Sequence, residues 1–160
     1  MDTKHLIATL ELQPHPEGGY YKETYRCNQS LTTEYGTQRN ISTAIYFLLE
    51  NENKSHFHRI KSDELWFFHQ GESLEILLIE KQELKIILLG NNIALGETPQ
   101  AMVPANTWFA SRVKNSIGHS LVSCTVAPGF DFRDFEMAKK KTLLTEFPLL
   151  KKEIEVMTLE

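Results

Sequence analysis

The fold and the site are predicted by residues 55–71, which read Ser55-His-Phe-His-Arg-Ile-Lys-Ser-Asp-Glu-Leu-Trp-Phe-Phe-His-Gln-Gly71. His56 and His58 are two residues apart, so on a β-strand both imidazoles would leave the same face. The Lys-Ser-Asp triplet is typical of a turn, and it would return the chain so that Glu64 approaches that face at the start of an apolar strand. Two histidines and a carboxylate form a plausible ligand set for one divalent metal ion.

The length and the charge of the chain narrow the classes of function. A chain of 160 residues fits a single domain over residues 1–160, which buries roughly 70% of the surface that its unfolded form exposes. The net charge of −4 lacks the basic excess that binding to a phosphate backbone requires, so we expect no nucleic-acid partner. No apolar run has the length of a membrane span or the form of a signal peptide, which predicts a cytoplasmic protein with no membrane partner. Cys27 and Cys124 are expected to be reduced.

The rest of the chain reads as short strands separated by turn residues. Besides the strands of the opening stretch, we expect strands over residues 20–27, 42–49, 74–80, 84–89, 93–102, 108–113 and 119–126. Short helices are expected only at the two ends, over residues 3–12 and after Pro148, and residues 28–40 are expected to be a surface loop. Strands at hairpin spacing, with no helix between them, favour an all-β antiparallel barrel or jelly roll.

His69 is a candidate catalytic acid or base whose orientation depends on strand regularity. Strict alternation places His69 on the face opposite Glu64. A bulge near Asp63 or Trp66 would reverse this and bring His69 into the pocket. Without such a bulge, His69 would pack at a sheet or dimer contact.

Four aromatic and polar residues are further candidates for the pocket. Trp66 and Trp108 would form a flat apolar wall against a ring-shaped ligand, with simple core packing as the alternative. Tyr21 and Glu23 share one face of the first strand, and a phenol and a carboxylate can fix the orientation of a small polar ligand or take part in catalysis.

The histidine stretch resembles the first motif of the cupin superfamily, in which His-x-His is followed by Glu and, after six further residues, by Gly. The gap before Glu64 is five residues long, where three or four are usual. The second cupin motif, Pro-x-Gly-x-x-His, is similar to residues 104–109. Asn106 stands in place of Gly there, which a left-handed turn tolerates, and Phe109 stands in place of the fourth metal ligand.

Blocks over nearly the whole chain resemble more narrowly the fifth cupin family, a bacterial and fungal family described as a domain of unknown function. The blocks are residues 15–21, 42–47, 61–66, Pro104-Ala105 with Trp108, and residues 124–132. This resemblance implies a double-stranded β-helix barrel with a pocket inside, usually as a homodimer. It implies no settled substrate, and the family's second motif generally lacks the ligand histidine.

Three functions are compatible with these patterns, and fold alone does not choose among them. The first is a cupin that binds a small molecule, with one divalent ion held by His56, His58 and Glu64. The second is a metal-independent epimerase or isomerase of a sugar or sugar nucleotide, in which a histidine removes a proton next to a carbonyl and Tyr21 or another phenol returns one. The third is a ligand-binding or storage module without chemistry.

Overall fold

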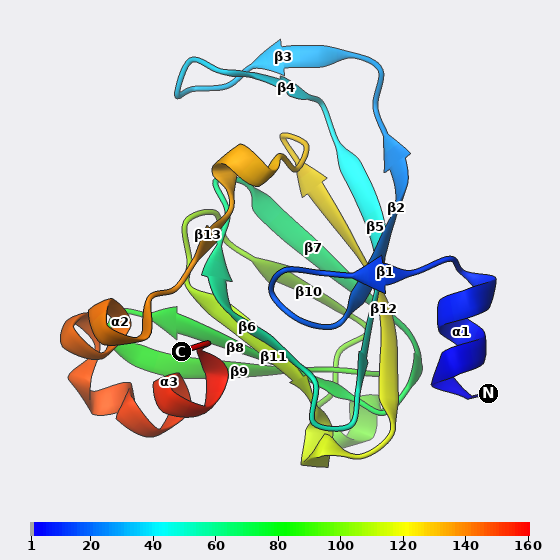
Figure 1. Ribbon diagram of the computed structural model, residues 1–160, viewed down its shortest axis with the longest axis vertical. Coiled ribbons are helices and arrows are strands. Elements are labelled where there is room, and N and C mark those ends of the chain that lie inside the picture. Colours follow the sequence, from blue (N-terminus) through cyan, green and yellow to red (C-terminus); the bar gives the residue numbers. More distant parts are fainter. Residues whose placement is uncertain (1) are drawn as a thin grey trace.

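Two antiparallel sheets face each other in the computed structural model, which describes residues 2–160 (Figure 1). The six-stranded sheet has, in spatial order, β1 (Gln13–Pro14), β2 (Tyr20–Arg26), β5 (Thr43–Glu50), β12 (His119–Ala127), β7 (Asp63–Gly71) and β10 (Gln100–Val103). The five-stranded sheet has β13 (Glu136–Met137), β6 (Lys54–Arg59), β11 (Phe109–Val113), β8 (Leu74–Glu80) and β9 (Glu83–Leu89). This arrangement is a jelly roll, so the predicted fold class is confirmed.

Smaller elements surround the two sheets. A separate hairpin is formed by β3 (Ser30–Thr32) and β4 (Gln38–Asn40). The α-helices are α1 (Thr3–Thr9), α2 (Lys140–Glu146) and α3 (Lys151–Met157). Short 3₁₀ turns are η1 (Ile93–Leu95), η2 (Lys114–Ser116), η3 (Phe132–Asp134) and η4 (Pro148–Leu150). The helices lie at the two ends of the chain, as the sequence predicts, although α2 precedes Pro148 and the expected C-terminal helix corresponds to α3.

Apolar side chains divide into an inner core and two outer clusters. Between the sheets, one core cluster includes Phe47, Trp66 and Phe109. Outside the six-stranded sheet, α1 packs on a cluster that includes Leu48 and Leu121. Outside the five-stranded sheet, α2 and α3 cover a cluster of strand and helix residues (Figure 1). Because the inner core fills only part of the space between the sheets, the other part is free to hold a ligand.

Two of the expected elements are wrong. Residues 28–40 are not a plain loop but contain the β3–β4 hairpin, in which Thr33 and Thr37 close the turn through side-chain and backbone hydrogen bonds. The strand expected over residues 93–102 is strand only in β10, because η1 and a left-handed Gly96 come first. Cys27 and Cys124 are both free, as expected.

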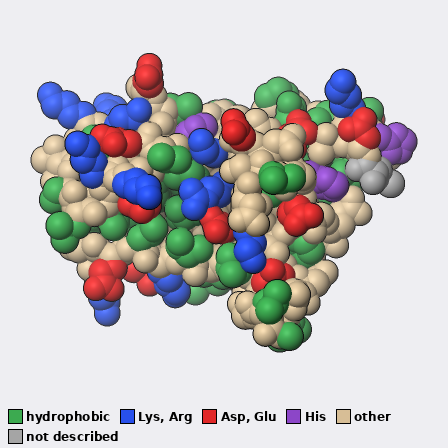
Figure 2. All heavy atoms as spheres, turned by 90° about the horizontal axis from the view of Figure 1, so that it is seen from below, with side chains coloured by type: hydrophobic (Ala, Val, Ile, Leu, Met, Phe, Trp, Pro, Cys, Tyr) green, Lys and Arg blue, Asp and Glu red, His purple; other side chains and the backbone are tan. Residues whose placement is uncertain are grey.

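Charged side chains of both signs lie on the surface. On the face shown in Figure 2, acidic and basic side chains are interspersed. Over residues 2–160, none of the helices combines the length and the apolar character that crossing a bilayer requires.

Candidate functional site

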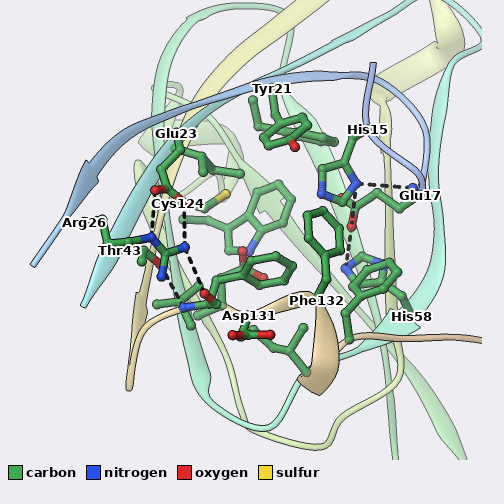
Figure 3. A pocket seen from close by; sticks show the side chains of 18 of the residues that line it. His15, Glu17, Tyr21, Glu23, Arg26, Thr43, His58, Cys124, Asp131 and Phe132 are labelled. Atoms are coloured by element: carbon green, nitrogen blue, oxygen red, sulfur yellow. Dashed lines mark hydrogen bonds and ion pairs between the residues drawn. The ribbon is translucent and has the colours of Figure 1, made fainter. Parts of the chain in front are cut away.

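A cavity of about 340 Å³ lies between the two sheets at the end opposite the packed core (Figure 3). Its lining combines apolar and ionisable side chains from both sheets and from two loops. The lining residues are Gln13, His15, Glu17, Tyr21, Glu23, Arg26, Thr43, Ile45, Phe47, His58, Ile60, Glu64, Trp66, Cys124, Val126, Phe130, Asp131, Phe132 and Phe135.

The inner face of the six-stranded sheet forms one wall of the cavity. Residues that pair across antiparallel strands project in rows that run across the sheet. The row beside the packed core consists of Tyr21, Phe47, Val122 and Phe68. The middle row consists of Glu23, Ile45, Cys124, Trp66 and Ala101. The third row consists of Arg26, Thr43, Val126, Glu64 and Val103.

A bulge in β2 brings Arg26 to this wall. The register against β5 shifts between Glu23 and Tyr25, so the alternation of faces is interrupted. Tyr25, which regular alternation places beside Tyr21 and Glu23, is instead 53% exposed. The Arg26 guanidinium forms two hydrogen bonds of 2.8 Å with the carboxylate of Glu23 and donates one of 3.1 Å to the carbonyl oxygen of Phe130.

A second bulge, in β6, changes the histidine pair. Opposite β11, His58 pairs with Phe109 and Ser55 pairs with Ser111, so three steps along β6 match two along β11. The extra residue turns Ser55 and His58 toward the same side. His56 therefore does not point into the cavity beside His58.

The loop before β2 carries Glu17 into the barrel. Glu17 is buried, and its carbonyl oxygen accepts a hydrogen bond of 2.8 Å from the backbone N–H of His56. Gly18 allows this approach, since it has φ of +110° and any Cβ at this position would overlap the carbonyl oxygen of Lys54. The His56 ring also contacts this carbonyl oxygen, with its Nδ1 atom 2.7 Å away.

Glu17 and His58 form the central polar contact of the site. The Nε2 atom of His58 lies 3.0 Å from Oε2 of Glu17, and Ser55 donates a hydrogen bond of 2.9 Å to Oε1. The Nδ1 atom of His58 is 2.7 Å from the His56 carbonyl oxygen, which can only accept, so Nδ1 carries a hydrogen. Because Nδ1 is occupied in this way, Nε2 is the ring atom that faces Glu17 and can share a proton with it.

His15 extends this contact toward the cavity. Its Nδ1 atom accepts a hydrogen bond of 3.2 Å from the backbone N–H of Glu17 and lies 3.4 Å from Oε2 of that residue. The neutral ring therefore carries its hydrogen on Nε2. Figure 3 shows His15, Glu17 and His58 close together on one side of the cavity, with Glu23, Arg26 and Thr43 on the other.

Burial shapes the protonation of these groups. Loss of solvation raises the pKa of Glu17 well above its ordinary value, and the charge of Glu64 raises it further. Loss of solvation also lowers the pKa of His58 to about 3 and that of His15 to about 4. It raises the pKa of Glu64 to about 7. Because Nδ1 of His58 carries a hydrogen, the 3.0 Å contact between Nε2 and Oε2 of Glu17 holds one shared proton, and burial favours the neutral forms of both groups.

Residues 130–135 close over the cavity. The Phe135 ring lies 5.3 Å from the His58 ring, centroid to centroid, and the Phe132 ring lies 5.8 Å from that of His15. Asp134 anchors this segment to β4 through hydrogen bonds of 2.6 and 2.8 Å from Arg39. The segment thus gives the two histidines an aromatic environment that limits their contact with water.

The chain matches a known family over most of its length. The model of the family described as "Cupin superfamily (DUF985)" matches residues 4–138. The chain belongs to the cupin superfamily. An uncharacterized protein of Saccharomyces cerevisiae is 29% identical over 150 residues, and the match covers 85% of this cupin and 75% of the yeast protein.

Solved structures agree with the family. A hypothetical protein from Leishmania major has a TM-score of 0.95 and 38% identity over 100% of both chains. A protein from Shewanella oneidensis has a TM-score of 0.92 and 39% identity over 99% of this cupin and 98% of its own chain. A mutant of Bacillus subtilis oxalate decarboxylase has a TM-score of 0.55 and 13% identity over 91% of this cupin and 37% of its own chain, a likeness of fold alone.

Five of the eight predicted site residues line the cavity of this cupin, and three lie outside it. Those in the lining are Tyr21, Glu23, His58, Glu64 and Trp66. His69 is exposed on the outer face of β7, where Nε2 is 2.8 Å from Oγ of Ser123. The bulge in β7 lies at His69 itself, after Trp66, so it does not turn His69 inward. Trp108 packs in the outer cluster under the helices, with the Arg59 guanidinium 4.2 Å from its ring centroid.

The predicted metal ligands do not come together. Within residues 2–160, no group of three His, Cys, Asp or Glu side chains is arranged to hold a metal ion. His56 is held against the Glu17 carbonyl by the β6 bulge, and Phe109 packs 4.1 Å from the His58 ring, centroid to centroid. His56, His58 and Glu64 therefore do not fit one divalent ion as a set.

Sequence reasoning missed His15, Glu17 and Cys124 as pocket residues. The family block over residues 15–21 holds the only available signal for the first two, because Gly18-Gly19 follows Glu17 directly and permits an unusually close backbone approach. Cys124 gives no such signal. It enters the lining because it pairs with Trp66 across the middle row.

Proposed function

We propose that this cupin binds a small carbonyl compound, such as a keto-sugar, and moves a proton on it with the Glu17–His58 pair in a step that needs no metal ion. The observation that carries the proposal is the 3.0 Å contact between Glu17 Oε2 and His58 Nε2 inside a cavity covered by aromatic rings. A general acid or base needs a pKa near the working pH and a position within reach of the substrate. Burial raises the pKa of Glu17 from its ordinary acidic value toward this range.

The proposed step uses the proton that the pair shares. When this proton is on His58, Glu17 is a carboxylate and accepts a proton from the carbon next to the substrate carbonyl. The enolate that forms is balanced by the imidazolium of His58, so the cavity gains no net charge. His15 offers the hydrogen on its Nε2 to the substrate oxygen, and the proton then returns from Glu17 to carbon. His58 keeps its orientation through its bond to the His56 carbonyl.

Exchange of substrate hydrogen in heavy water tests the proposal. We expect NMR to show deuterium at carbon in at least one member of a panel of keto- and aldo-sugars. Glu17→Gln and His58→Asn should each slow this exchange by about 10²-fold or more, the usual contribution of general acid–base catalysis. His69→Asn is the matched control, because His69 lies outside the cavity and should be dispensable. Exchange that continues unchanged in Glu17→Gln would contradict the proposal.

The same assay separates the other two functions. If no compound exchanges but one of them raises the melting temperature, the result supports a binding module without chemistry. If EDTA abolishes exchange and one divalent ion restores it, the result supports the metal-dependent function. For the metal-independent step, we expect exchange to survive EDTA and the metal content of His56→Ala to equal that of the unsubstituted protein.

A further inference from the structure

Glu64 is a carboxyl group of the cavity that has no cationic partner among the described residues. Glu17 has His58 at 3.0 Å, and Glu23 has the Arg26 guanidinium at 2.8 Å. Asp131 accepts hydrogen bonds of 2.6 and 2.9 Å from Arg133. Within residues 2–160, Glu64 forms no ion pair, and the indole N–H of Trp66 and the thiol of Cys124 approach it only as weak donors, although the side chain is buried with 8% exposure.

The immediate neighbours of Glu64 offer little compensation for a negative charge. It lies between Val126 and Val103 in the third row. The indole N–H of Trp66 and the thiol of Cys124 are close enough to lower its pKa, but burial outweighs both and the pKa stays raised. The Trp66 Nε1 atom itself has no hydrogen-bond partner within residues 2–160.

Aromatic rings surround the same space. The Phe47 and Trp66 rings meet edge to face with centroids 5.8 Å apart, and Tyr21 pairs with Phe47 in the row beside the core. The faces of such rings carry partial negative charge and attract cations. The cavity has no lysine in its lining, and its one arginine, Arg26, is already occupied by Glu23.

A buried carboxylate without a partner is costly, and its cost is removed by a cation or by a proton. A carboxylate or phosphate on the ligand would be repelled by the Glu64 carboxylate, because no free cation in the lining would balance the two negative charges. A metal ion would need two or three further ligand atoms, which the surroundings of Glu64 lack. A protonated amine needs one acceptor and apolar or aromatic contacts around its carbon atoms, and both are present.

We propose that the part of the cavity formed by Glu64, Trp66 and Phe47 binds the protonated amino group of a small organic amine. The amine nitrogen donates to the Glu64 carboxylate, and the aromatic rings contact the adjoining carbon atoms. As a statement about the substrate, this inference rests on the proposed function. The substrate would then be a carbonyl compound that also carries an amino group. The charge of Glu64 also acts on Glu17, so the binding of amines is separated from the proton transfer by substituting each residue in turn.

Calorimetric titration with three probes of the same shape tests this proposal. The probes are benzylamine, which is a cation, benzyl alcohol, which is neutral, and benzoate, which is an anion. We expect benzylamine to bind at least about tenfold more tightly than benzyl alcohol, as a charge-assisted hydrogen bond provides, and benzoate to bind most weakly. Glu64→Gln should abolish the preference for the amine, while Glu17→Gln should keep it and lose hydrogen exchange.

Each outcome decides the matter. Equal binding of benzylamine and benzyl alcohol to the unsubstituted protein, or a preference that survives Glu64→Gln, would overturn the amine site. A titration with MnCl₂ in place of the amine gives the third arm, because Glu64-dependent binding of Mn²⁺ with no preference for benzylamine would assign Glu64 to a metal. Loss of exchange in Glu17→Gln with amine binding intact would support both proposals. Amine binding without any exchange would support this site and count against the proposed function.

Discussion

Replacing Glu64 by Gln should stabilise the protein, and increasingly so as the pH rises. Gln keeps the shape of the side chain and removes its titration. In the folded protein, burial raises the pKa of Glu64 from 4.5 to about 7. Since each pH unit corresponds to about 1.36 kcal/mol, ionised Glu64 costs up to about 3 kcal/mol of unfolding free energy.

The direction of this pH dependence follows from the raised pKa. Below 4.5, Glu64 is protonated in both the folded and the unfolded chain, and it costs nothing. As the pH rises through about 7, the folded protein must ionise a buried group that water would solvate in the unfolded chain, so stability is lost. We therefore expect Glu64→Gln to be nearly neutral at about pH 4.5 and stabilising by up to about 3 kcal/mol at about pH 8.

Urea unfolding at the two pH values measures this difference, and the midpoints convert to free energies by linear extrapolation. Phosphate and acetate buffers should be used, because Tris is itself an organic amine and could occupy the site. Glu52→Gln is the control, since Glu52 is exposed in the turn between β5 and β6 and should give the same free-energy difference at both pH values. If Glu64→Gln destabilises the protein at about pH 8, or if its effect does not change with pH, the burial argument is wrong.

Two further predictions concern the frame of the site and its outer face. Gly18→Ala should lower the unfolding free energy by about 1–3 kcal/mol or more, because the backbone is left-handed there and the new methyl group would overlap the Lys54 carbonyl. An unchanged midpoint in urea unfolding would show that the loop tolerates a shift. On the outer face of β7 and β10, Phe67 is half-buried and Met102 is 46% exposed, with uncharged Ser123 and Thr125 beside them. An uncharged centre suits a two-fold contact, so we expect a homodimer by sedimentation that Phe67→Glu converts to a monomer; a monomeric unsubstituted protein would refute this.

Most of the fold could be predicted from the local pattern of the chain. The β8–β9 hairpin and strands such as β5 and β12 follow from apolar runs bounded by turn residues, whose period of two is a local property. The errors fall where the local pattern is weak. Residues 28–40 are mostly polar, and their β3–β4 pairing is held partly by Arg39, whose partner Asp134 is distant in sequence.

The candidate site was only partly predictable. His58, Glu64, Trp66, Tyr21 and Glu23 reach the cavity because each sits on the expected face of its strand. The sequence predicts His56 beside His58 in the site, but the structure places Glu17 there. A single extra residue in β6 turns the two histidines toward different sides. The sequence of one strand does not show where its pairing register with the adjacent strand will shift.

Sequence by itself determined that this chain forms a jelly roll and that a histidine and a carboxylate from two strands consecutive in the chain face its interior. These features depend on alternation and turns, which act over a few residues. Only the tertiary structure decided that Glu17 meets His58 and that Glu64 is left without a cationic partner. Both depend on contacts between distant segments: the loop that Gly18 lets pass beside β6, and the register of β12 against β7. Their cause is the packing of the two sheets, which no single stretch of the chain encodes.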